Sequence, residues 1–233
     1  MRGLYYGMEY YSSWITFVLP FLLLAFYAQY KIKSTYNKFS KVSSGTVNSG
    51  ADIARIILDR NGLRNVRVNQ VGGTLSDHYD PRTKTVNLSR DVYRGNSISS
   101  VSIAAHEVGH ALQDAEEYIP LKIRSAIVPI ANLGSRFVWP MIFLGVAIAP
   151  FFIELGIALF LGVILFQVVT LPVEFNASSR AIAQLENGII EMDQINGSKK
   201  VLRAAALTYV TAALVSVGEL FRILSMTENR RRN

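Results

Sequence analysis

The sequence predicts a mainly α protein, a polytopic membrane helix bundle with a small α+β cytoplasmic layer. Two observations lead to this fold class. Half of the 233 residues are hydrophobic and only 18% are charged, which is unusual for a soluble domain. Long apolar runs alternate with polar stretches, and the polar stretch after the first run contains both helical and strand patterns. The net charge of +7 is concentrated beside the apolar runs, a position typical of residues that contact lipid head groups.

The first apolar run covers residues 14–30 and contains no charged residue. A helix of about 20 residues crosses a hydrocarbon core of about 30 Å, so we predict a transmembrane helix here. One arginine precedes the run and several lysines follow it, which differs from the pattern of a cleaved signal peptide, so we expect the helix to be retained. Because positive flanks stay in the cytoplasm, residues 31–125 are predicted to form a cytoplasmic region.

The cytoplasmic region is expected to contain two helices and two strands. Apolar residues recur at helical spacing through 49–62, and Gly62 is suited to end that helix. Residues 66–71 and 85–89 have the pattern of strands, and the Gly-, Asp- and Pro-rich stretch between them predicts turns. A longer helix is expected over 97–118, because this stretch lacks proline and begins with serines that can cap a helix.

A membrane hairpin is predicted over residues 126–173. It contains two apolar runs, 137–153 and 155–173, separated by a break around Pro150 and Glu154. Basic residues stand before the first run and after the second, so both ends of the hairpin are expected in the cytoplasm.

The chain is predicted to end with a cytoplasmic segment, 174–203, and a C-terminal membrane helix, 204–226. Glu219 and Arg222 interrupt the apolar run of this helix, and an outward crossing would place the basic end of the chain on the unfavourable side. Two alternatives remain open. The helix is either a fourth span or a helix that packs against the bundle with both charged residues at the interface.

Two of the three histidines, His106 and His110, stand four residues apart in the helix expected over 97–118, with Glu107 directly after the first. On a helix this spacing puts both imidazoles on one face, one turn apart, where they can bind the same metal ion. Glu107 can then reach a water at the metal and act as a general base for hydrolysis. Because the chain contains no cysteine, any further ligand must be His, Asp or Glu.

A catalytic zinc site uses three protein ligands and keeps one position open. We favour Glu174 as the third ligand, because it follows the third apolar run on the membrane side expected for the histidine pair. His78, in the turn-rich stretch, is the alternative, whereas Glu154 belongs to the opposite end of the hairpin. Zinc is the expected metal, although His and Glu ligands also accept cobalt, manganese or iron.

Further residues are assigned supporting roles. Gly109 is expected to leave room beside the metal, and His78, if it is not a ligand, either stabilises an oxyanion or satisfies the backbone of its loop. Residues 85–89 are a candidate edge strand that receives an extended substrate. Three polar residues after Glu174 are expected to hydrogen-bond the ligands: Asn176, Ser178 and Arg180.

Four segments carry a resemblance to a known family: TLSDHYDP, HEVGHALQ, LPVEFNASSRA and AAALTYVTAALVS. Over nearly the whole chain they resemble the YugP-type zinc metallopeptidases of bacterial membranes. The chain is also similar, more distantly, to HtpX-type and CaaX prenyl membrane proteases. The resemblance implies a zincin-like layer and a gluzincin-like site with His106, His110 and Glu174 as zinc ligands and Glu107 as the base.

One position departs from the pattern of the distant relatives. They carry an Asp one turn after the ligand Glu, where this chain has Ser178. The departure implies that a carboxylate that orients a ligand is either missing or supplied from elsewhere in the chain, with Asp77 and Asp80 as candidates.

We therefore expect an integral membrane zinc-dependent endopeptidase, multi-pass in the cell membrane, that hydrolyses peptide bonds near the cytoplasmic membrane surface. A membrane-associated protein or peptide is the expected substrate, and membrane lipids are expected partners. Nucleic acid is not an expected partner. The alternative is a non-proteolytic scaffold or adaptor that retains a structural metal site. An intact Glu107 favours the enzyme, because a structural site needs no base beside the metal. The sequence makes no prediction of the oligomeric state.

Overall fold

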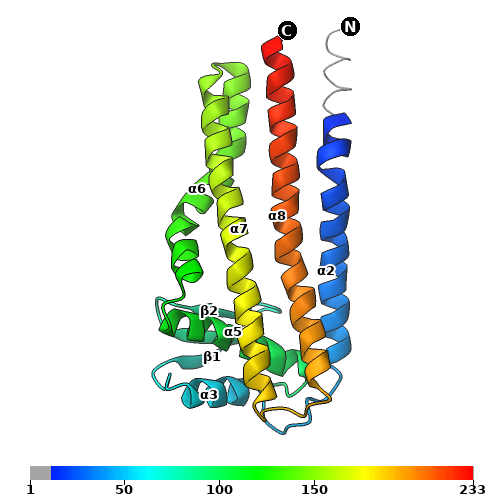
Figure 1. Ribbon diagram of the computed structural model, residues 1–233, viewed down its shortest axis with the longest axis vertical. Coiled ribbons are helices and arrows are strands. Elements are labelled where there is room, and N and C mark those ends of the chain that lie inside the picture. The colour runs from blue at the N-terminus through cyan, green and yellow to red at the C-terminus, as the bar shows by residue number, and fades with distance from the viewer. Residues whose placement is uncertain (1–11, 233) are drawn as a thin grey trace. The chain divides into compact units, whose positions relative to one another are not determined.

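The computed structural model describes residues 12–232, with side chains described up to residue 227. The described chain is mainly helical and contains one small sheet, as predicted. The helices are α2 (Leu19–Phe39), α3 (Gly50–Arg60), α4 (Arg90–Arg94), α5 (Ile98–Ala115), α6 (Ile119–Ala147), α7 (Phe151–Glu186) and α8 (Ile195–Arg232) (Figure 1). The strands are β1 (Arg67–Val71), β2 (His78–Asp80) and β3 (Thr85–Ser89).

The chain divides into two compact units. The first, which we call the helical unit, comprises Met1–Gln29, Ile123–Leu171 and Leu207–Asn233. The second, which we call the mixed unit, comprises Tyr30–Lys122 and Pro172–Ala206. Four helices, α2, α6, α7 and α8, begin in one unit and end in the other.

Within residues 12–232, three helices are long and apolar enough to cross a membrane: α6, α7, and α8 as far as Thr227. The hairpin predicted over 126–173 corresponds to α6 and α7, although α6 begins earlier than predicted, at Ile119. Residues 14–30 are helical apart from a turn at Val18. They are not among the three candidate spans of the described chain, so their crossing stays a prediction.

The two charged residues that interrupt the last apolar run form an ion pair in the helical unit, with Arg222 buried and Glu219 partly buried. Arg222 is 3% exposed, and its guanidinium donates hydrogen bonds to the carboxylate of Glu219, one turn earlier. The same guanidinium lies 5.4 Å from the ring centroid of Trp139 on α6. Pairing offsets the cost of burying both charges among apolar helices. The pair accounts for charged residues in α8 whether this helix spans the membrane or packs against the bundle.

The mixed unit contains a three-stranded sheet in the order β1-β3-β2. Val86 of β3 lies opposite Val68 of the parallel strand β1 and opposite Tyr79 of the antiparallel strand β2. The strand β2 was not predicted, because it is short and lies among turn residues. Since β3 has a strand on each side, the prediction that residues 85–89 form an edge strand is wrong. The edges of the sheet are β1 and β2.

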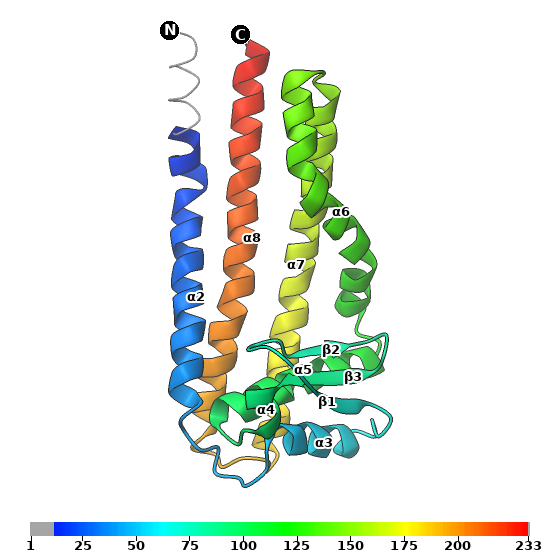
Figure 2. The same cartoon turned by 180° about the vertical axis from the view of Figure 1, so that it is seen from behind.

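Helices α3 and α5 pack against each other and against this sheet (Figure 2). α3 contacts β1, and α5 contacts β2 and β3. The parts of α7 and α8 that belong to the mixed unit add side chains to the same core, so the unit is assembled from segments far apart in the sequence. Its buried apolar residues include Ile53, Ile57, Leu58, Val86, Leu88, Val101, Val108, Leu185 and Leu202.

The ends of α3 agree with the sequence signals. Ser49 is the N-cap, and it forms a capping box with Asp52 in which each side chain accepts a hydrogen bond from the other residue's backbone N–H. The hydrogen bonds from the Ser49 hydroxyl and backbone lower the pKa of Asp52. Gly62, just after the C-cap Asn61, has a φ of +75°, which glycine adopts without steric cost.

The capping box makes a prediction about local stability. We expect Ser49→Ala to destabilise α3 by about 1 kcal/mol, since the N-cap hydroxyl is lost. That change corresponds to roughly fivefold faster hydrogen exchange of the α3 amides. The matched control is Ser40→Ala, because the Ser40 hydroxyl donates only to Asn37 O at the end of α2. Equal exchange rates in α3 for the two variants would contradict the assignment.

Candidate metal centre

The histidine pair lies on α5, which begins as the sequence predicted. The side chain of Ser97 accepts a hydrogen bond from Ser100 N and so caps the helix. Most of α5 is buried, because α3, α4 and the sheet pack around it. The rings of His106 and His110 lie one turn apart, edge to face, with centroids 4.8 Å apart. Helical spacing therefore brings the two imidazoles together, as expected.

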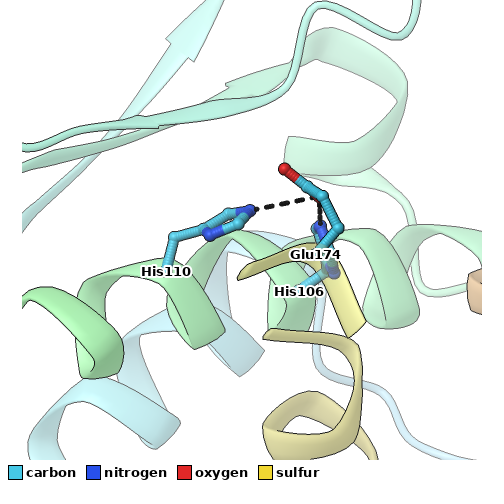
Figure 3. Close-up of side chains that lie close together, drawn as sticks. All are labelled: His106, His110 and Glu174. Atoms are coloured by element: carbon cyan, nitrogen blue, oxygen red, sulfur yellow. Dashed lines mark hydrogen bonds and ion pairs between the residues drawn. The ribbon is translucent and has the colours of Figure 1, made fainter. Parts of the chain in front are cut away.

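Glu174 on α7 places its carboxylate against both imidazoles (Figure 3). Its Oε2 lies 3.2 Å from His106 Nε2 and 3.6 Å from His110 Nε2. One ligand atom from each of the three residues lies within 4.8 Å of the other two, so the group could hold a metal ion. The Glu174 side chain is 3% exposed. The structure thus brings together the two histidines and the carboxylate that the sequence analysis favoured.

Gly109 allows α5 and α7 to approach each other closely. A Cβ atom at this position would lie 2.6 Å from the backbone oxygen of Ala177. The missing side chain therefore makes room for the backbone of α7, whereas we expected it to leave room beside a metal. Because Ala177 is about one turn after Glu174, this contact sets how near the carboxylate comes to the histidines.

Behind His110, hydrogen bonds connect α5 to α7. His110 Nδ1 lies 3.0 Å from Gln113 Oε1. The Nε2 of Gln113 donates to Val173 O at 2.8 Å and to Asn176 Oδ1 at 2.9 Å. Gln113 is fully buried, and all the polar atoms of its side chain take part in these contacts. Gln113 was not among the predicted site residues, although its spacing in the sequence puts it on the same helix face as His106 and His110.

Arg180 extends the same network to the surface. Its Nε donates to Asn176 Oδ1 at 2.7 Å, and its two terminal nitrogens donate to the two carboxylate oxygens of Glu116, also at 2.7 Å. The guanidinium lowers the pKa of Glu116. Since Glu116 is the C-cap residue of α5, this bidentate ion pair is a second link between α5 and α7.

Behind His106, the partner is Ser178, whose Oγ lies 3.2 Å from His106 Nδ1. The residue that departs from the pattern of the distant relatives is thus itself in contact with the histidine. Asp77 accepts hydrogen bonds from the backbone and side chain of Ser89, and Asp80 accepts bonds within the turn after β2. These contacts support the alternative in which the orienting carboxylate is missing.

Glu107 is buried beside the histidine pair, with 8% of its surface exposed. Burial raises the pKa of its carboxyl group, and the neighbouring imidazoles oppose this rise. A raised pKa suits a group that must both accept and release a proton near neutral pH.

His78 is not part of the group formed by His106, His110 and Glu174. It is an exposed residue of the edge strand β2. Its Nδ1 lies 2.8 Å from Ser76 O, and its Nε2 lies 3.2 Å from Asn87 Nδ2. These contacts support the interpretation that His78 satisfies polar groups of its own loop and strand.

Comparison with known proteins agrees with the resemblance noted in the sequence. The model of a family described as "Putative neutral zinc metallopeptidase" matches residues 14–228. A relative from Bacillus subtilis (strain 168), "Putative membrane protease YugP", is 51% identical over 211 residues, which cover 89% of this chain and 93% of the relative. No solved structure shows significant similarity to the chain. With a match over almost its whole length, the chain belongs to this family of neutral zinc metallopeptidases.

Proposed function

We propose that the chain is an integral membrane zinc endopeptidase in which His106, His110 and Glu174 hold the metal and Glu107 is the general base. One observation carries the proposal. In a chain of a zinc peptidase family, two imidazole nitrogens and a carboxylate oxygen converge to within 4.8 Å of one another.

The residues present fit zinc. Two imidazoles and one carboxylate form a common ligand set of catalytic zinc. Three protein ligands leave the fourth coordination position of the metal open. The Nδ1 atoms of His106 and His110 face hydrogen-bond partners from the protein, so the Nε2 atoms remain to bind the metal. Zinc held here would act as a Lewis acid that polarises a substrate carbonyl and makes water more acidic.

Glu107 supplies the proton transfers of the reaction. Its carboxylate accepts a proton from the attacking water and later donates a proton to the amine that leaves. Burial on α5 assists the second transfer, because it favours the protonated form of the carboxyl group. Hydrolysis of this kind needs no covalent link between the enzyme and the peptide.

We place the mixed unit on the cytoplasmic side of the membrane. Lysines gather along the part of α2 that belongs to this unit and just after it, and the positive-inside rule assigns such residues to the cytoplasm: Lys31, Lys33, Lys38 and Lys41. The apolar surfaces of α6 and α7 are the proposed lipid contacts, since large side chains such as Phe143 and Phe151 are exposed there. Membrane-associated proteins or peptides are the proposed substrates.

A scaffold with a structural metal site is the less favoured alternative. Structural zinc sites generally have four protein ligands. Within the described chain, the group around His106 contains three residues able to bind a metal. Three ligands and a buried carboxylate beside them favour catalysis.

The general base provides the first test of the proposal. We expect Glu107→Gln to lower the cleavage rate about 100- to 10,000-fold, because the amide cannot accept the proton, while zinc content stays unchanged. Cleavage of casein and of a membrane-protein substrate by purified protein measures the rate. Glu186→Gln is the control, since Glu186, the last residue of α7, forms its ion pair with Lys199 of α8. Equal activity of Glu107→Gln and the unchanged protein would end the protease proposal.

The choice of third ligand makes a separate prediction. We expect Glu174→Ala to lose zinc, because only the two histidines would remain to hold it. We expect His78→Ala to keep zinc, since its imidazole contacts Ser76 and Asn87. Metal analysis of the purified variants measures both. Zinc retained in the first variant and lost in the second would reverse the assignment.

The close approach at Gly109 can be tested without altering a ligand. In an ordinary helix position, Gly→Ala is stabilising by about 1 kcal/mol. At Gly109 we expect the opposite effect and weaker zinc binding, because the new methyl group would overlap Ala177 O and push α7 away. Thermal unfolding and zinc titration measure the two effects. Gly72→Ala is the control, since a Cβ there meets no atom within 4 Å. Unchanged zinc affinity in Gly109→Ala would contradict the role of this contact.

A further inference from the structure

The hydrogen bonds behind His110 determine where its ring proton lies. A neutral imidazole carries one proton, on either Nδ1 or Nε2, and binds a metal through the nitrogen that lacks it. A hydroxyl or amide side chain does not by itself decide between these tautomers, because a hydroxyl can rotate and an amide can flip. Here the network ends at two groups whose roles cannot change.

The first of these groups is the backbone carbonyl of Val173, which can only accept a hydrogen bond. The second is the guanidinium of Arg180, which can only donate. Since Arg180 Nε lies 2.7 Å from the side-chain amide of Asn176, the atom facing it is Oδ1. The Gln113 amide faces both Val173 O and Asn176 Oδ1, so it must present its nitrogen to them.

The orientation of Gln113 then fixes the tautomer of His110. With its nitrogen directed toward α7, Gln113 presents Oε1 to His110 Nδ1 at 3.0 Å. An amide oxygen only accepts hydrogen bonds, so Nδ1 must carry the proton. In the neutral ring, His110 Nε2 then carries no proton. Its lone pair is directed toward the side of the ring where Glu174 lies.

His106 is in a different situation. Its Nδ1 faces the Ser178 hydroxyl, which can rotate to donate or to accept. On the other side of the ring, His106 Nε2 lies 3.2 Å from Glu174 Oε2, which is within hydrogen-bond distance. The Glu174 carboxylate can only accept a hydrogen bond. Without a metal, a proton on His106 Nε2 is therefore favoured, and Ser178 can donate to Nδ1.

We propose that Gln113 is a positioning residue that holds His110 in the Nδ1–H tautomer before the metal binds, whereas His106 changes tautomer when the metal binds. Ser178 allows this change because its hydroxyl can switch from donor to acceptor. The consequence for zinc affinity rests on the proposed function. The tautomers themselves do not, because they are a property of the metal-free protein.

The experiment is NMR of full-length, metal-free protein labelled with ¹⁵N-histidine, at an alkaline pH where the imidazoles are neutral. The chain contains only three histidines, so single substitutions assign every signal. The spectra should show His110 protonated on Nδ1 and His106 protonated on Nε2. His110 protonated on Nε2, or a mixture of tautomers at His110, would overturn the proposal, and this outcome can be read from the unchanged protein alone.

Variants of Gln113 separate positioning from packing. Gln113→Met keeps the bulk of the side chain but removes the acceptor, so His110 should become a mixture of tautomers and the zinc dissociation constant should rise about 10- to 100-fold. Gln113→Glu restores an acceptor for His110 Nδ1 and should return His110 to the Nδ1–H form, but its second oxygen cannot donate to Val173 O, so we also expect this variant to be less stable. Gln184→Met on α7 is the control, because the Gln184 amide contacts Asn61 and lies outside the network. A single Nδ1–H form in Gln113→Met would overturn the role of Gln113.

Failure of this inference is distinguishable from failure of the proposed function. If His110 is protonated on Nδ1 but the protein binds no zinc and cleaves no peptide, the zinc peptidase proposal fails and the tautomer assignment stands. If the protein is an active zinc peptidase but His110 has no fixed tautomer, the tautomer assignment fails and the zinc peptidase proposal stands.

Discussion

The close contact between α5 and α7 is the constraint on which the candidate metal centre depends. Zinc binds nitrogen and oxygen ligands at about 2 Å, so its ligand atoms must lie within a few ångströms of one another. Two of the three come from α5 and the third from α7. The helix backbones come together at Gly109, where one added methyl group would overlap Ala177 O. Helix axes ordinarily lie about 8–10 Å apart, which leaves room for side chains at the contact. Here Gly109 has no side chain, so the backbones of α5 and α7 can come closer together.

The same interface is fixed along the helix axes by buried polar groups. Apolar side chains tolerate small shifts between two helices, whereas a buried amide left without its partner costs about 1–3 kcal/mol. Gln113, Asn176 and Arg180 are all satisfied only when α5 and α7 stand in one register. The hydrogen-bond network therefore favours one register of α5 against α7 at the close contact that Gly109 makes possible. Both effects bring Glu174 to the histidines, although none of these residues is itself a ligand.

The parts of this arrangement that follow from local spacing could be predicted from the sequence. The helical period puts His106 and His110 on one face, and Ser49 and Gly62 mark the ends of α3. Apolar runs were enough to predict the helices α6 and α7. The length of α6 was underestimated, because it begins at Ile119, well before the apolar run, and continues through Pro129, a residue type that sequence rules treat as a helix breaker.

The features that depend on contacts between distant segments could not be predicted. The position of β3 at the centre of the sheet depends on β2, whose three residues lie among turn signals. The partners of Gln113 are about sixty residues further along the chain, so its spacing from His110 gave no indication of them. Ser178 was predicted to hydrogen-bond a ligand, but its contact with His106 in particular depends on how α7 faces α5. Local patterns located the reactive groups, and tertiary contacts determine how they are held.

The two histidines are supported by groups of different rigidity, and this difference has a physical consequence. An amide bonded at both ends, as in Gln113, has one orientation and gives up little freedom when a metal binds, so it lowers the cost of ordering the site. A hydroxyl such as Ser178 can accept or donate, so the hydrogen bond to His106 survives a change in the ring. At the proposed metal site, one histidine is therefore held in one state and the other can adapt. The contrast between an amide behind His110 and a hydroxyl behind His106 provides both kinds of support within two turns of one helix.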